Sequence, residues 1–158
     1  MEVDNLDFAI QQLIIYWEGQ SISFGKKTEK DFEYYQRKKN VQLPSDFKTL
    51  YSNANGMESK YPNETDNEGF LFYPLEEIVT GKEIFQGHDE IKENSDDRLI
   101  VFADYMHRSW YYGIRFNQND NNYKVGIIPE RMKFTPICNS LSEFINLYLT
   151  NSSRLYNY

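Results

Sequence analysis

Few residues in this chain of 158 could act as nucleophiles or proton carriers, and they are widely spaced. The single cysteine, Cys138, has no nearby Lys, Arg or His in the sequence to lower its pKa, so we expect a small, half-buried thiol. The two histidines, His88 and His107, lie in predicted loops and are expected to be surface side chains. One cysteine forms no intramolecular disulfide, and no Cys and His cluster has the spacing of zinc ligands. The sequence therefore predicts no disulfide, no metal site and no cofactor.

The sequence contains no complete motif for phosphate binding or for hydrolysis. Gly25-Lys26-Lys27-Thr28 looks like the end of a phosphate-binding loop, but Gln20 stands where the first glycine belongs and Lys27 where Ser or Thr belongs. No Gly-x-Ser-x-Gly, His-Glu-x-x-His or Gly-x-Gly-x-x-Gly pattern occurs in the sequence. Carboxylates are so numerous in one segment that none is singled out as an acid or base. We do not expect an enzyme.

The net charge of -7 is unevenly distributed along the chain. Residues 58–97 hold twelve acidic side chains against three lysines, whereas the flanking segments are close to balanced. Phosphate contacts require Lys and Arg, so this acidity argues against direct binding of nucleic acid and favours a basic protein partner. The alternative is a set of solvated loops whose charge keeps the protein soluble.

Aromatic side chains exceed what a core of this size needs, with 13 Tyr, 11 Phe and 2 Trp. Some Tyr and Trp are therefore expected at the surface, where they provide contact area at low entropic cost. The alternative is Tyr half-buried at sheet edges. The spare aromatic surface is compatible with a monomer or a weak homodimer.

No export or membrane signal is predicted. Residues 1–7 carry three acids and no basic residue, unlike a signal peptide, and no apolar run approaches 18 residues. Because a lone cysteine also suits a reducing compartment, we expect a cytoplasmic protein that does not contact membranes.

Apolar residues at helical spacing predict helices over about residues 5–17 and 29–39, and a last helix ending near 150. Asp4 or Asn5 is the expected N-cap of the first helix. Thr28 with Asp31, and Ser140 with Glu143, are predicted capping boxes for the other two.

The stretch from Leu43 to Met57 carries the most specific helix signals. Pro44 disfavours helix at Leu43, and Ser45 is the predicted N-cap of a helix that begins there. Asn55-Gly56 is predicted to form a left-handed C-cap. One face of this helix, expected to be buried, carries Phe47, Leu50, Tyr51 and Ala54.

Alternation of apolar and polar residues predicts strands in the C-terminal two thirds of the chain. A central strand is expected over 99–103, a hairpin over 110–116 and 123–128, and a compact strand over 69–73. A helix is expected over 75–85, with loops over 57–68 and 86–97. Together these elements predict one α+β domain over residues 1–158, with a mainly antiparallel or mixed sheet packed against N-terminal helices and a C-terminal helix.

Six short motifs occur in this order along the chain: Leu43-Pro44, Phe47-Lys48, Asn55-Gly56, Phe102-Ala103-Asp104, Tyr112-Gly113-Ile114 and Ser142-Glu143-Phe144. Their order and spacing resemble the SUKH superfamily, the cell-wall-assembly-regulator-like domain of many bacterial immunity proteins. The resemblance covers about residues 5–150 and implies a SUKH-like fold that acts by binding other proteins, without shared catalytic residues. The turn over 105–110 departs from the family pattern, because it is bulky where members often have a glycine-rich or acidic turn.

The resemblance and the charge pattern together predict an immunity protein that binds and neutralises a cognate toxin. A basic nuclease is the expected toxin, because an acidic surface can occupy the groove that binds phosphates. The alternative is an intracellular regulatory or scaffold protein, linked to cell-wall assembly, that binds a partner protein. The predicted contact residues flank the end of the helix that begins at Ser45 and the end of the central strand over 99–103: Glu58, Glu64, Asp66, Glu68, Asp104, Tyr105, Trp110 and Tyr111.

Overall fold

The structure, a computed structural model, describes residues 5–58, 65–84, 97–117, 122–129 and 134–156. His88 and Phe85 lie outside these ranges, as do residues 59–64 of the predicted loop over 57–68, most of the predicted loop over 86–97, and residues 118–121 between the predicted hairpin strands. The helices are α1 Leu6–Gly19, α2 Glu29–Lys39, α3 Ser45–Asn53, α4 Gly81–Ile84 and α5 Leu141–Leu149, with 3-10 turns η1 Leu75–Glu77 and η2 Ser153–Tyr156. The strands are β1 Phe70–Phe72, β2 Val79–Thr80, β3 Asp97–Tyr105, β4 Trp110–Asn117, β5 Tyr123–Ile128 and β6 Thr135–Cys138.

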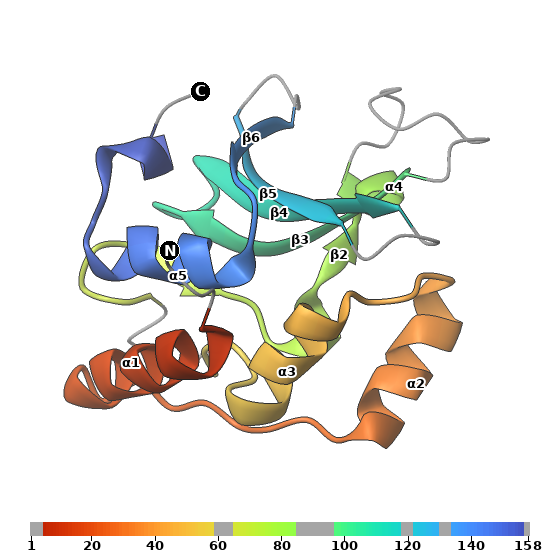
Figure 1. The fold of residues 1–158 in the computed structure, drawn as a ribbon, viewed down its shortest axis with the longest axis horizontal. Coiled ribbons are helices and arrows are strands. Elements are labelled where there is room, and N and C mark those ends of the chain that lie inside the picture. The colour runs from red at the N-terminus through yellow and green to blue at the C-terminus, as the bar shows by residue number, and fades with distance from the viewer. Residues whose placement is uncertain (1–4, 59–64, 85–96, 118–121, 130–133, 157–158) are drawn as a thin grey trace.

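An antiparallel sheet lies over a layer of helices (Figure 1). Its strand order is β1-β3-β4-β5-β6, and β2 pairs with β3 next to β1. In Figure 1, α1, α3 and α5 lie on the lower side of the sheet, and α2 lies beyond α3. This arrangement confirms the predicted α+β class, with the sheet in the C-terminal two thirds and a C-terminal helix.

Aromatic rings fill the contact between the helices and the sheet. The ring of Phe72 on β1 lies 5.3 Å from Trp17 of α1 and 4.9 Å from Tyr148 of α5, while Phe102 on β3 lies 5.3 Å from Phe144. Much of the aromatic content therefore belongs to the core. Within the described ranges, no helix combines the length and apolarity needed to cross a membrane.

The predicted N-caps of three helices are confirmed. Asn5 accepts a hydrogen bond from the Phe8 amide, Thr28 and Asp31 form a complete capping box, and Ser140 accepts from the Glu143 amide. The predicted box at Ser140 is only half formed, because the Glu143 carboxylate accepts from the Asn139 amide. Each cap satisfies a backbone N–H that has no partner within its own helix.

The predicted caps of α3 are wrong. Ser45 is its first helical residue, and Pro44 occupies the N-cap position without a side-chain hydrogen bond. At the other end Ala54 is the extended C-cap, so Asn55-Gly56 lies beyond the helix.

Asn55-Gly56 instead ties the end of α3 to the chain that follows β1. The Asn55 side chain accepts a hydrogen bond of 2.8 Å from the Leu75 amide. Gly56 has a φ of 62°, and a Cβ atom there would come within 2.3 Å of the Tyr73 carbonyl oxygen. The site therefore requires glycine for both its conformation and its lack of a side chain.

The predicted helix over 75–85 is also wrong. The segment contains the turn η1, the strand β2 and the short helix α4, because Val79 and Thr80 pair with Val101 and Ile100 of β3. The sequence reasoning also missed β6, which contains Pro136 and pairs only with β5 among the described strands.

Replacing Gly56 with Ala should destabilise the protein by at least about 2 kcal/mol, because the left-handed backbone and the Tyr73 carbonyl both oppose a side chain. Gly19→Ala is the matched control: a Cβ there meets no atom within 4 Å, so its stability should be unchanged or higher by up to about 1 kcal/mol. Urea unfolding of both variants measures the difference, and equal midpoints would contradict this role of Gly56.

Candidate protein-binding surface

The structure divides the eight predicted contact residues into groups. Glu64 lies outside the described residues. Asp66 and Asp104 are buried, with 5% and 2% of their surface exposed. Glu58 and Glu68 are exposed. The half-buried aromatic residues are Tyr105, Trp110 and Tyr111.

Asp66 points into the protein and holds three elements together. One carboxylate oxygen accepts hydrogen bonds from the amides of Glu68 (2.8 Å) and Phe70 (2.9 Å), and the other accepts from the Tyr148 hydroxyl of α5. That hydroxyl accepts in turn from the Trp17 indole of α1, 3.1 Å away. Burial, followed by the Asp66 charge, raises the pKa of Tyr148. We therefore remove Asp66 from the proposed contact surface and assign it a structural role, in which its hydrogen bonds connect β1, α5 and, through Tyr148, α1.

Asp104 has the corresponding role beneath the turn between β3 and β4. Its carboxylate accepts a 2.5 Å hydrogen bond from the Tyr73 hydroxyl and a longer one, 3.4 Å, from the Arg108 amide. Burial, followed by the hydrogen bond to Asp104, raises the pKa of Tyr73. Asp104 therefore links the turn to Tyr73 inside the protein, and we remove it from the contact surface as well.

The turn itself is strained. Met106, His107 and Arg108 have φ values of 50°, 55° and 70°, and none of them is glycine. A left-handed conformation costs such residues about 1–2 kcal/mol each. Hydrogen bonds from the Ser109 amide to Tyr105 and Met106 close the turn. The result is that three side chains, including a Met106 that is 51% exposed, are displayed at the surface.

Aromatic rings pack beside this turn. Tyr105 and Trp110 are paired across β3 and β4, and their rings stack at 4.8 Å with an angle of 27°. Tyr156 of η2 packs edge-on against both rings, at 5.4 and 6.2 Å. Burial, with smaller effects of Tyr105, Glu68 and Asp66, raises the pKa of Tyr156 to about 12.

We call this surface the hairpin tip, which consists of Glu68, Tyr105, Met106, Trp110 and Tyr156. Sequence reasoning missed Met106 and Tyr156. The bulky turn over 105–110, which departs from the family pattern, was a signal that could have led to Met106, whereas nothing near Tyr156 in the sequence indicates its packing against the turn.

Tyr111 lies on the other face of the sheet, since neighbouring residues of a strand point to opposite sides. There it lines a groove of about 620 Å³ together with Leu71, Glu77 and Arg108. The structure thus brings Tyr105 and Trp110 together but separates Tyr111 from them.

The acidic segment contributes less free charge than its composition suggests. Glu76 pairs with Lys27, and Glu83 pairs with Lys39 at 2.6 Å. Such surface pairs add little stability, but each cancels a charge that a partner would otherwise meet. The acids at 89, 90, 93 and 96 lie outside the described residues.

The described residues contain no group of three His, Cys, Asp or Glu side chains arranged to hold a metal ion. Cys138 is more buried than expected, with 4% of its surface exposed, and its Sγ donates to the Ser140 carbonyl. Burial raises the pKa of its thiol to about 12, which leaves little thiolate for nucleophilic attack.

Comparison with protein families identifies the fold. The model of the SMI1/KNR4 family (SUKH-1) matches residues 26–147, which is most of the chain. The chain belongs to the SMI1/KNR4 (SUKH-1) family. This finding confirms the resemblance drawn from the sequence motifs and supports an immunity-like or regulatory domain. No curated protein matches the chain. The hairpin turn lies within the matched range, whereas α1 precedes it and η2 follows it.

Replacing His107 with Gly should stabilise the protein by roughly 0.5–1 kcal/mol, because the relief of the left-handed strain exceeds the entropic cost of glycine. The control is Gln42→Gly. Gln42 is exposed in the connection between α2 and α3 and does not have a positive φ, so this variant should lose about 0.5–1 kcal/mol of stability. Thermal and urea unfolding compare the two, and loss of stability in His107→Gly would show that the turn is not strained.

Alkaline pH should destabilise the protein partly through Cys138. Its thiol has an ordinary pKa of 9.0 and a folded-state pKa of about 12, so the unfolded chain loses this proton first as pH rises. The stabilisation is present below pH 9 and is lost between pH 9 and 12. Urea unfolding across this range should show a shallower decline for Cys138→Ala than for the natural protein. Equal slopes would contradict the raised pKa.

Proposed function

We propose that this protein is a cytoplasmic immunity protein, without catalytic activity, that neutralises a toxin by binding it through the hairpin tip. The observation that carries the proposal is an exposed Met106 beside a stacked Tyr105 and Trp110 on a strained, braced turn. Membership of a family of immunity-like and regulatory domains supports it.

The hairpin tip has the composition of a protein-binding centre. Tyr and Trp are frequent anchors of protein interfaces, and Met adapts to irregular apolar surfaces. The indole N–H of Trp110 donates to the Tyr112 hydroxyl at 2.9 Å, so its polar atom is satisfied within the protein. Association would therefore bury ring surface without leaving that donor unpaired.

The charge around the tip favours a basic partner. Glu68 is close enough to Tyr156 for its charge to contribute to the raised pKa of that tyrosine. Glu58 is also exposed, and the whole chain has a net charge of -7. A nuclease must present Lys and Arg to phosphates, so we propose a basic nuclease domain as the toxin. Complementary charges would speed the encounter and exclude nucleic acid from the same groove.

The regulatory alternative uses the same surface on a different partner. In that case the protein binds a component linked to cell-wall assembly and protects no cell from a toxin. The neighbouring gene separates the two functions, because immunity requires a toxin-like C-terminal domain encoded beside this chain.

Binding to the purified toxin domain encoded by the neighbouring gene tests the proposal. Met106→Ser and Glu68→Lys should each weaken binding by about tenfold or more, since they remove a contact and reverse a charge at the tip. The matched control is Glu33→Lys on α2, a reversal of another exposed acid away from the tip, which should leave the Kd nearly unchanged. Calorimetry gives the Kd at two salt concentrations, and circular dichroism checks that each variant is folded.

Binding that is unaffected by both tip variants would refute the hairpin tip as the contact surface. Failure of the natural protein to bind the toxin domain, or to rescue cells that express it, would refute the immunity function. Binding that does not weaken as salt increases would refute the electrostatic part of the proposal.

A further inference from the structure

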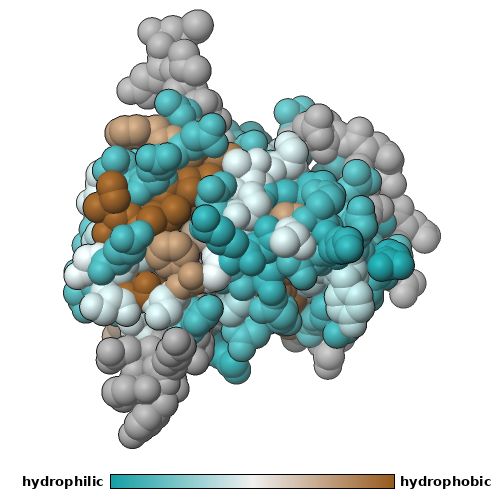
Figure 2. All heavy atoms as spheres, turned by 90° about the horizontal axis from the view of Figure 1, so that it is seen from below, coloured by the Kyte–Doolittle hydropathy of each residue, from teal (hydrophilic) through white to brown (hydrophobic). Residues whose placement is uncertain are grey.

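The outer face of α1 carries large apolar side chains that the core does not use. Phe8 is 61% exposed and Ile15 is 63% exposed, and they are seven positions apart in the sequence, so they lie about two turns apart along the helix. The opposite face of α1 is buried in the core through Ile10, Leu13 and Trp17. Figure 2 shows hydrophobic surface gathered on the half of the molecule where Figure 1 places α1. Packing of the core therefore does not explain why large apolar side chains lie on this outer face of α1.

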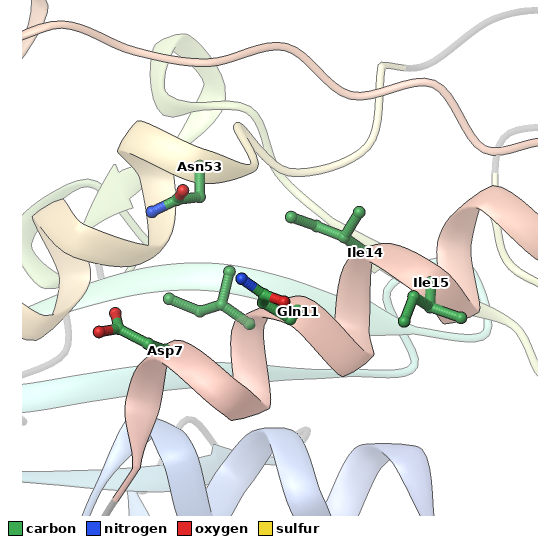
Figure 3. A pocket seen from close by; sticks show the side chains of 6 residues that line it. Asp7, Gln11, Ile14, Ile15 and Asn53 are labelled. Atoms are coloured by element: carbon green, nitrogen blue, oxygen red, sulfur yellow. The ribbon is translucent and has the colours of Figure 1, made fainter.

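A groove lies next to these side chains, between α1 and α3. It has a volume of about 390 Å³ and is lined by Asp7, Ile10, Gln11, Ile14 and Ile15 of α1 and by Asn53 of α3. Figure 3 shows the labelled α1 side chains following the helix from Asp7 to Ile15, with Asn53 above them on α3. A volume of this size lies within the usual range of binding pockets, and three isoleucines share its lining with three polar residues.

The charges along α1 are all negative. Asp7 lies in the first turn and Glu18 in the last, and residues 5–25 contain no Lys or Arg. A second copy of the chain docked on this face would bring acid against acid in either orientation of the two helices. An anionic membrane surface would be repelled for the same reason. A partner with cations at the two ends of an apolar stripe would match the face.

We infer that the groove between α1 and α3 binds an amphipathic helix of a partner protein. That helix would present apolar residues at i, i+3 or i+4, and i+7 to Phe8, Ile14 and Ile15, and Lys or Arg to Asp7 and Glu18. The inference does not rest on family membership, because the α1 side of the groove precedes the matched residues 26–147. The site shares no residue with the hairpin tip, so it stands or fails independently of the proposed function.

A phage-displayed library of helical peptides, randomised along one face and selected against the full chain, tests the inference. Enriched peptides should carry apolar residues at the stated spacing with Lys or Arg at both ends. Phe8→Ser and Ile15→Ser should each weaken binding of these peptides by about tenfold or more, measured by fluorescence polarisation. Both residues are mostly exposed, so these variants should fold, and circular dichroism checks that they do.

Two controls make the result specific. Tyr34→Ser removes a side chain with similar exposure, 62%, from α2 and should leave peptide binding unchanged. Met106→Ser alters the hairpin tip and should also leave it unchanged. Replacing the Lys and Arg of an enriched peptide with Glu should abolish measurable binding.

Several outcomes would overturn the inference. They are a selection that enriches no helical peptide, enrichment of acidic peptides, and equal binding of the peptides to the natural protein and to both α1 variants. Self-association that is detected by sedimentation and lost in Ile15→Ser would instead assign the face to a second copy of the chain.

Discussion

The buried carboxylate of Asp66 is the interaction on which the rest of the structure depends. A carboxylate removed from water must be fully hydrogen-bonded, and Asp66 achieves this by accepting from two amides next to β1 and from the Tyr148 hydroxyl. Because Tyr148 also accepts from Trp17, one charge joins α1, α5 and the edge of the sheet. Asp104 makes a second buried acceptor site on the other face of the sheet, where it accepts from the Tyr73 hydroxyl and from the Arg108 amide of the hairpin turn.

Signals that lie within a few residues of one another in the sequence were sufficient to predict the helix caps and the apolar faces of the helices. The caps at Asn5, Thr28 and Ser140 depend on contacts within a few residues, and the apolar stripes of α1, α2 and α5 follow from the helical period of the sequence. The segment 75–85 was mispredicted because Val79 gains more by pairing with Val101, 22 positions away, than by continuing a short helix. Strand β6 was missed because Pro136 is unfavourable within a sheet but tolerated at an edge.

The candidate surface was predicted only in part. Tyr105 and Trp110 do meet, because the hairpin register that pairs them is set by local alternation. Asp66 and Asp104 looked like surface acids, since their hydrogen-bond donors Tyr148 and Tyr73 lie 82 and 31 residues away in the chain. Burial of an acid depends on such distant partners, and composition alone does not reveal it. The same limit explains why Tyr156 was not predicted at the tip.

The central claim is that the buried acids hold the surface and the exposed residues of the hairpin tip recognise the partner. Measuring both the unfolding free energy and the Kd for the toxin domain in Asp66→Asn tests it most directly. We predict a loss of about 1–3 kcal/mol in stability, because the Tyr148 and amide donors lose a charged acceptor, with a Kd within about twofold of the natural protein. Unchanged stability together with a Kd weakened tenfold or more would contradict the account, because it would place the Asp66 carboxylate in the interface.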